Sequence, residues 1–159
     1  MANGERLIAV VLAVAFDNED KVLLTRRNDP VNASVHGYWQ FPGGVMEFGE
    51  HPEQTLRREV EEELQVGEIR LLRNQPIVRS TTFTRQDSER EQIADQLLVL
   101  AYVVSLPKEV NIDNDPETLA YAWFAYSELE PLKTLPLVKG IAEEAKAIWD
   151  ELKRQNRIG

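Results

Sequence analysis

Three glutamates, Glu59, Glu62 and Glu63, stand close together in the middle of the chain. The spacings i, i+3 and i+4 make such side chains neighbours on one face of a helix. Neighbouring carboxylates repel one another unless a cation lies between them, and Mg²⁺ and Mn²⁺ prefer carboxylate oxygens as ligands. The segment therefore predicts a site for a hard divalent cation, with Mg²⁺ as the expected ion and Mn²⁺ as a substitute.

A glycine pair lies just upstream of the acidic segment. Pro42, Gly43 and Gly44 form a predicted tight turn whose backbone no side chain covers. A turn of this kind leading into an acidic helix suits a metal site that faces a phosphate-bearing substrate. Acidic helices on their own usually face water, so the ordered pattern of the whole segment, glycine turn included, is what favours the metal site.

Residues 44–66, GVMEFGEHPEQTLRREVEEELQV, resemble the Nudix box, G-x5-E-x7-R-E-U-x-E-E-x-G-U, in which U is an aliphatic residue. The fixed positions are filled by Gly44, Glu50, Arg58, Glu59, Val60, Glu62, Glu63 and Val66. Gln65 departs from the pattern, which has glycine near the end of the helix, where a left-handed residue is often needed. We expect Gly67, two residues later, to take over part of that role.

The resemblance implies metal ligands and a positioning arginine. Glu59, Glu62 and Glu63 would bind the metal, together with the backbone carbonyl of Gly43. Arg58 and Glu62 are four residues apart and are expected to pair, which would leave Glu59 and Glu63 as the freer ligands.

The resemblance leaves the general base open. In some Nudix enzymes it is the first glutamate of the helix, here Glu59, and in others a downstream loop residue, here Glu117. Asp115 is the reserve candidate in that loop. Glu47 and Glu50 are expected to stabilise the glycine loop or to reach the metal through water.

Residues outside the helix supply the predicted substrate contacts. Arg26 and Arg27 end a predicted strand, and strand alternation sends one to each face. Similarity to Nudix enzymes favours Arg27 for phosphate contact, whereas the alternative for both is a plain charged strand end. Trp39 and Gly44 complete the predicted substrate site. Three further aromatic residues could stack on a base, although aromatic residues more often lie in a core: Tyr38, Phe83 and Trp123.

The element order predicts an α/β fold. Strands are predicted at 7–16, 21–27, 69–84, 96–105 and 121–126, and helices from Pro52 to the end of the box and over 138–154. The first two strands are expected to form a hairpin. The polar stretch 85–91 separates two later strands as a solvated loop, with a lid or dimer contact as alternatives. A mixed sheet between helices agrees with the α/β/α sandwich that the Nudix resemblance implies.

Composition excludes several classes of protein. The 159 residues suit a single domain over 1–159, and a formal net charge of −9 disfavours nucleic acid and anionic lipid as partners. The chain has no cysteine, which excludes disulfides and thiolate metal sites and fits the cytoplasm. The longest apolar stretch, 7–16, is too short to cross a bilayer and has no signal-peptide features.

The resemblance implies an enzyme that hydrolyses a diphosphate linkage in a nucleoside diphosphate linked to X. A nucleoside triphosphate, including an oxidised one, is the leading substrate. ADP-ribose, nucleotide sugars, dinucleoside polyphosphates and capped RNA 5′ ends stay open. A nucleotide-binding sensor module and a structural Ca²⁺ site are the alternatives of other classes. Nudix enzymes are often homodimers, which is an analogy for this chain.

Overall fold

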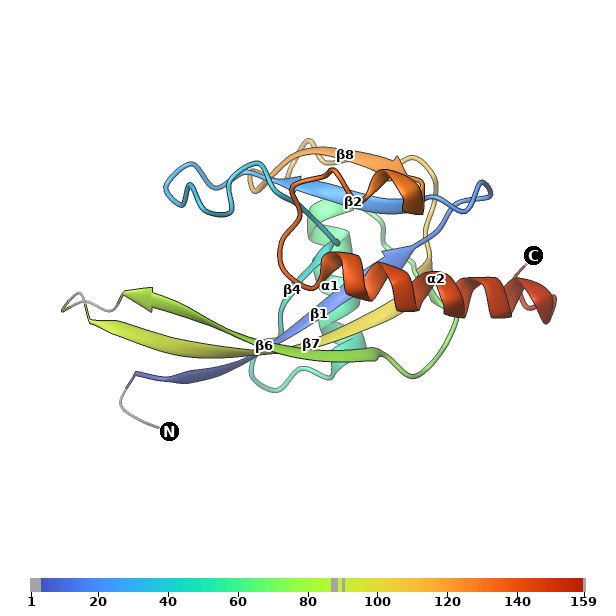
Figure 1. Cartoon of the computed structure of the whole chain (residues 1–159). Coiled ribbons are helices and arrows are strands. Elements are labelled where there is room, and N and C mark those ends of the chain that lie inside the picture. The colour runs from blue at the N-terminus through green and yellow to red at the C-terminus, as the bar shows by residue number, and fades with distance from the viewer. Residues whose placement is uncertain (1–3, 87–88, 90, 159) are drawn as a thin grey trace.

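The computed structural model describes residues 4–86, 89 and 91–158 and contains two β-sheets and two α-helices (Figure 1). Residues 87, 88 and 90 of the predicted loop 85–91 lie outside the described residues. The elements are β1 (Arg6–Ala15), β2 (Val22–Arg27), β3 (Trp39–Gln40), β4 (Gly43–Val45), α1 (Pro52–Leu64), β5 (Arg70–Leu71), β6 (Ile77–Gln86), β7 (Gln92–Ser105), β8 (Thr118–Phe124), the 3₁₀ turn η1 (Tyr126–Glu128) and α2 (Val138–Arg154).

The larger sheet is mixed, as the sequence predicts. β1 pairs in parallel with β7 over ten residue pairs, from Arg6 opposite Asp95 to Ala15 opposite Val104. β4 is antiparallel to β1, and both β5 and β6 are antiparallel to β7. The smaller sheet is antiparallel, in the order β3-β2-β8.

The predicted hairpin between 7–16 and 21–27 is wrong beyond its turn. Asp17 holds the turn, because its Oδ1 accepts hydrogen bonds from the backbone N–H groups of Glu19 and Lys21. Past the single bridge between Phe16 and Val22, however, β1 and β2 enter different sheets. The physical reason is that β7 occupies one edge of β1 along the whole strand and β4 occupies the other edge over residues 10–12, so a hairpin with β2 cannot extend along β1.

Other strand boundaries differ from the sequence prediction. The predicted strand 69–84 is split into β5 and β6, and Pro76 lies directly before β6. Proline has no N–H to donate to a sheet, which favours the break. The next strand, β7, begins earlier than predicted, at Gln92, and β8 begins at Thr118. Both predicted helices are confirmed, the first beginning at Pro52 and the second spanning 138–154.

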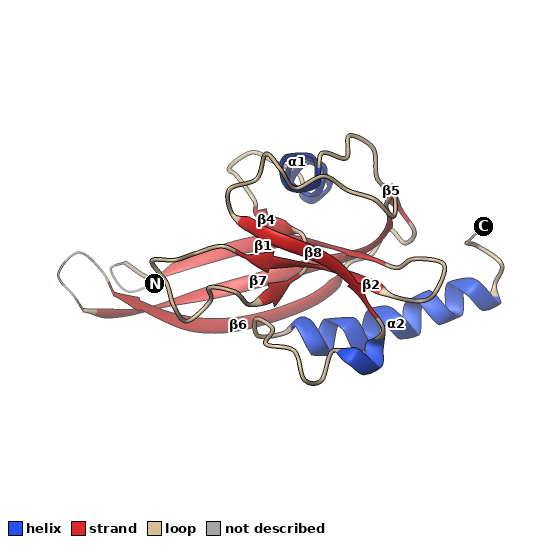
Figure 2. Ribbon diagram, turned by 90° about the horizontal axis from the view of Figure 1, so that it is seen from above, coloured by secondary structure: helices blue, strands red, loops and turns tan. Residues whose placement is uncertain are grey.

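The two helices cover opposite faces of the larger sheet, as the predicted α/β/α sandwich requires (Figure 2). The buried stripe of α1, Leu56, Val60 and Leu64, packs in one core with Val11 and other residues of β1 and β7. The stripe of α2 packs in a second core, where Trp149 stacks on Phe16 at 5.1 Å between ring centroids. Each fully buried side chain of this size contributes about 1.5–3 kcal/mol, so both helices are firmly fixed to the sheet.

The smaller sheet joins the two cores. Within β2, Leu23 lies in the α1-side core and Leu24 in the α2-side core, as strand alternation requires. This packing fixes the end of β2 and its neighbour β8 relative to α1. Neither helix of the described residues is long and apolar enough to cross a membrane.

Candidate active site

The acidic helix α1 begins and ends within the predicted segment. His51 is the N-cap residue, and its backbone N–H donates to Oε1 of Gln54 at 2.7 Å. Pro52 occupies the first turn, where a missing N–H costs nothing. At the other end Gln65 itself adopts the left-handed conformation, with φ of 55°, and its N–H bonds to the carbonyl of Glu61. The expectation that Gly67 takes over this role is therefore wrong.

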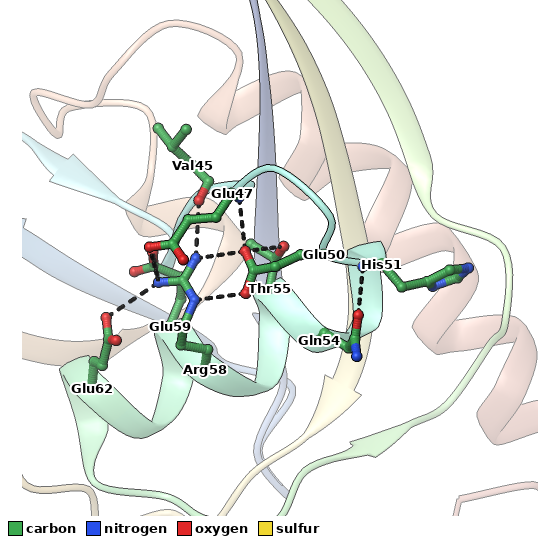
Figure 3. A network of polar contacts seen from close by, with 9 residues as sticks. All are labelled: Val45, Glu47, Glu50, His51, Gln54, Thr55, Arg58, Glu59 and Glu62. Atoms are coloured by element: carbon green, nitrogen blue, oxygen red, sulfur yellow. Dashed lines mark hydrogen bonds and ion pairs between the residues drawn. The ribbon is translucent and has the colours of Figure 1, made fainter.

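Arg58, in the middle of α1, is the centre of a polar network between this helix and the loop before it (Figure 3). Its Nε and Nη2 donate to both oxygens of Glu50, at 2.8 and 2.9 Å, and Nη2 also donates to the Val45 carbonyl at 3.1 Å. These charged hydrogen bonds lower the pKa of Glu50 to about 2. Arg58 thus ties the loop that follows β4 to α1.

The predicted pairing of Arg58 with Glu62 is at most secondary. The distance from Nη1 to Glu62 Oε2 is 3.5 Å, whereas Nη1 lies 2.8 Å from Glu59 Oε1. The side chain of Glu62 is 59% exposed. The arginine prefers Glu50 because that carboxylate meets its guanidinium with two oxygens at once. Glu62, rather than Glu59, is the freer carboxylate.

Glu59 lies against bare backbone. A Cβ placed on Gly44 would come 2.4 Å from Cδ of Glu59, so the absence of a side chain at Gly44 is what admits this carboxylate. Partial burial raises the pKa of Glu59, although the contact with Arg58 acts in the opposite direction. The carboxylate is therefore held in a place where its charge is poorly solvated.

Glu63 is the second carboxylate at the glycine turn. Its Oε2 accepts a hydrogen bond from the backbone N–H of Gly43 at 3.2 Å. Burial raises its pKa well above the usual range, and the charges of Glu59, Asp115 and Glu117 act in the same direction. The structure thus brings the predicted loop residues Asp115 and Glu117 into the electrostatic surroundings of the box helix.

Comparison with known proteins agrees with this geometry. Residues 6–144 match the family model described as the NUDIX domain. The chain belongs to the Nudix family. The resemblance of residues 44–66 to the Nudix box is confirmed.

Relatives of the chain include enzymes with different named substrates. The chain is 28% identical to the RNA pyrophosphohydrolase of a Nitratiruptor species, over 87% of this chain and 90% of the relative. It is 35% identical to the 8-oxo-dGTP diphosphatase of Proteus vulgaris, over 38% of this chain and 52% of that protein. The crystal structure of a MutT NUDIX hydrolase from Burkholderia pseudomallei matches with a TM-score of 0.59 and 22% identity, covering 86% of this chain and 96% of that one, which shows a shared fold.

Nudix proteins generally use a divalent metal ion, and the residues at the glycine turn fit one. Glu59 and Glu63 are both partly buried, and poor solvation raises the pKa of each. A nearby cation would favour their charged forms and offset the cost of burying these two charges. Among the described residues, no group of three or more acidic, histidine or cysteine side chains is arranged so that it could hold a metal ion. This fits the contacts seen, in which Arg58 and the Gly43 N–H hold two of the carboxylates.

The predicted substrate residues lie around the smaller sheet. Arg27 pairs with Asp29 at 3.2 Å, whereas Arg26 donates its Nε to the Gly37 carbonyl at 3.0 Å. The register of β2 with β8 shifts between these two arginines. The ring of Trp39 packs edge-on against Phe124 at 4.9 Å between centroids.

The other aromatic candidates are placed as follows. Tyr38 is partly buried in the turn before β3, and Trp123 Nε1 donates to the carbonyl of Lys108 at 2.9 Å. Phe83 is exposed on β6, opposite Asp95 of β7.

Asn28 lies beside the predicted site, and no sequence pattern predicts its contacts there. Asn28 lies in a polar loop after β2, and its backbone and side chain both donate to the loop that contains Glu117. Only the pairing of β2 with β8 brings these two loops together. Nothing in the local sequence around Asn28 indicates that contact.

Proposed function

We propose that this Nudix protein hydrolyses the diphosphate linkage of a nucleoside triphosphate, including an oxidised one, with Mg²⁺ or Mn²⁺. The observation that carries the proposal is the packing of Glu59 and Glu63 against the Gly43-Gly44 turn. This arrangement gathers partly buried negative charge beside bare backbone, where a cation and a phosphate group can approach closely. The products would be a nucleoside monophosphate and inorganic diphosphate.

Each residue of the site has a proposed part in this reaction. Glu59, Glu62, Glu63 and the Gly43 carbonyl would hold the cation. When bound, the cation would neutralise phosphate charge and make water a stronger acid. Arg58 orients Glu59 through its charged hydrogen bond, and Arg27 would contact the phosphate chain once released from Asp29.

Two residues, Glu59 and Glu117, are the candidates for the general base. Arg58 contacts Oε1 of Glu59, which lowers the basicity of that carboxylate. Glu117 is exposed, and among the described residues its carboxylate takes part in no hydrogen bond or ion pair. Glu117 is therefore the better placed of the two to take a proton from the attacking water. Trp39 would stack on the base, with Gly44 leaving space for the phosphates.

RNA with a 5′-triphosphate is the second candidate substrate. The relative matched over most of both chains is named an RNA pyrophosphohydrolase. The bond cleaved would be of the same kind, so the site could serve either substrate. Against a long RNA, several cations of the described residues already pair with acids: Arg6 and Arg85 pair with Asp95, and Arg79 with Glu144. Binding of RNA depends chiefly on free Lys and Arg contacts to phosphate.

A substrate panel tests the proposal. Nucleoside triphosphates, oxidised triphosphates, a short 5′-triphosphate RNA, ADP-ribose, nucleotide sugars and dinucleoside polyphosphates would each be incubated with Mg²⁺ and with Mn²⁺. The matched pair of variants is Glu63→Gln in the site and Glu61→Gln on the exposed side of α1. We expect turnover of triphosphates that Glu63→Gln loses and Glu61→Gln retains.

Other outcomes of the panel point elsewhere. Turnover confined to the RNA would favour the second candidate. Binding of a nucleotide without turnover of any substrate would favour a sensor module. Stabilisation by Ca²⁺ alone would favour a structural metal site. A single domain, a cytoplasmic location and a homodimer stay predictions.

A further inference from the structure

The loop that carries Glu117 is fastened to the end of β2 by one residue. Asn28 donates its backbone N–H to the carbonyl of Glu117 at 2.8 Å and its side-chain Nδ2 to the carbonyl of Pro116, also at 2.8 Å. We propose that Asn28 is a positioning residue that holds Glu117 facing the box glutamates. This inference rests on the proposed function, because it assigns Asn28 a part in that reaction through Glu117.

The Glu117 loop is also braced from within. Asp115 Oδ1 accepts the backbone N–H of Glu117 at 3.0 Å, and Oδ2 accepts the hydroxyl of Thr118 at 2.5 Å. These contacts fix the shape of the end of the loop. The start of the loop is held to α1, because Asn111 donates its backbone N–H to the Leu64 carbonyl at 3.0 Å. Asn28 attaches the other end to β2, because its two donors reach two consecutive carbonyls of the loop.

A β-bulge lies at the same place. Arg26 is opposite Ala120, whereas Arg27 is opposite Thr118, so Leu119 is an extra residue in β8. A bulge bends a strand and changes the direction in which the adjoining side chains point. The bulge and the two Asn28 hydrogen bonds together set where the chain enters β8, and Glu117 is the residue just before it.

Electrostatic repulsion acts against this position of the loop. Glu117 lies near enough to the box helix for its carboxylate to raise the pKa of Glu59 and of Glu63. A loop without the contact to β2 would relieve this repulsion by moving away from α1. Asn28 opposes that movement, and because it is neutral, it adds no charge of its own to the metal site. Replacing it therefore tests position without changing the local charge.

The test is a double-mutant cycle between Asn28→Ala and Glu117→Gln. Asn32→Ala is the matched control, because Asn32 is an exposed asparagine of the same loop whose side chain contacts Ser34. We expect Asn28→Ala to lower kcat by about 10-fold or more with little change in KM, since small displacements of a reacting group are costly. In the Glu117→Gln background the same change should alter kcat less than about twofold, because coupled residues are not additive.

A second readout needs neither metal nor substrate. Hydrogen exchange of residues 113–118 in the metal-free protein should become about 2- to 10-fold faster in Asn28→Ala, the loss expected for one hydrogen bond. Asn32→Ala should leave that exchange unchanged. Unchanged hydrogen exchange in Asn28→Ala would overturn the inference that Asn28 attaches the Glu117 loop to the end of β2.

The kinetic outcomes separate this inference from the proposed function. An equal loss of kcat from Asn28→Ala in both backgrounds would overturn the positioning role. Full activity of Glu117→Gln would overturn it too, while leaving the hydrolase itself intact. A wild-type protein that turns over none of the substrates would instead overturn the proposed function.

Discussion

The carboxylate of Glu59 lies in the space that a side chain at Gly44 would occupy, with Cδ 2.4 Å from the position of a Cβ there. The clashing atoms are the far end of a flexible side chain, so the fold can yield while the carboxylate moves. We therefore expect Gly44→Ala to change the free energy of unfolding by less than about 1 kcal/mol. Its kcat should fall by about 10- to 100-fold, because Glu59 is displaced. Urea unfolding and the hydrolysis rate, measured together, check both parts.

Gly43→Ala, unlike Gly44→Ala, should lower the stability of the fold. Gly43 has φ of 143°, and a Cβ there would lie 2.1 Å from the Val11 carbonyl oxygen, which belongs to the backbone of β1. Since that strand cannot move aside, we expect a loss of about 1–3 kcal/mol or more in the free energy of unfolding. If the Gly43 and Gly44 variants were equally stable, the distinction between a clash with backbone at Gly43 and a clash with a side chain at Gly44 would be contradicted.

Gln65 offers a test of the one departure from the Nudix box. A non-glycine residue in the left-handed region is strained, and glycine avoids this strain at some cost in chain entropy. We expect Gln65→Gly to raise the free energy of unfolding by about 0.5–1 kcal/mol, with unchanged hydrolysis. Gln65→Ala is the control and should bring no gain. A glycine variant no more stable than the alanine variant would contradict the account of this helix end.

Asp95 should make stability depend on pH. Its side chain is fully buried in β7, and hydrogen bonds from Arg6 and then Arg85 lower its pKa to about 2. The ordinary pKa of an aspartate in an unfolded chain is about 3.9. Because the folded value is the lower one, the contribution is present above about pH 4 and is lost as the pH falls toward 2.

The Asp95→Asn variant isolates that contribution. We expect it to be less stable than the wild type at neutral pH, with the difference shrinking as the pH falls through this window. Urea unfolding over a pH series measures it. Glu143→Gln removes an exposed carboxylate of α2 and should keep the wild-type pH dependence. A constant difference between Asp95→Asn and the wild type at every pH would refute the assignment.

The sequence predicts best what is determined locally. Pro52 and the stripe Leu56, Val60 and Leu64 determine α1 through short spacings, and the structure confirms its start and its buried face. The pairing of β1 with β7 could not be predicted, because strands so far apart in the chain leave no local sign of contact. The predicted hairpin failed for this reason.

The same distinction applies to the site. The glutamates of α1 follow from the box, but the preference of Arg58 for Glu50 depends on how the loop before the helix folds back. The contact of Asn28 with Pro116 joins residues 88 apart in the chain. The first contact follows from the fold of the loop between β4 and α1, and the second from the pairing of β2 with β8.

The most direct test of the metal site is the dependence of the hydrolysis rate on Mg²⁺ concentration in the wild type, Glu63→Gln and Glu61→Gln. We expect no hydrolysis without the cation. Glu63→Gln should need more Mg²⁺ and reach a lower maximum rate, whereas Glu61→Gln should follow the wild-type curve. A Glu63→Gln variant with the wild-type Mg²⁺ dependence and rate would contradict the proposal that the carboxylates at the glycine turn hold the catalytic metal.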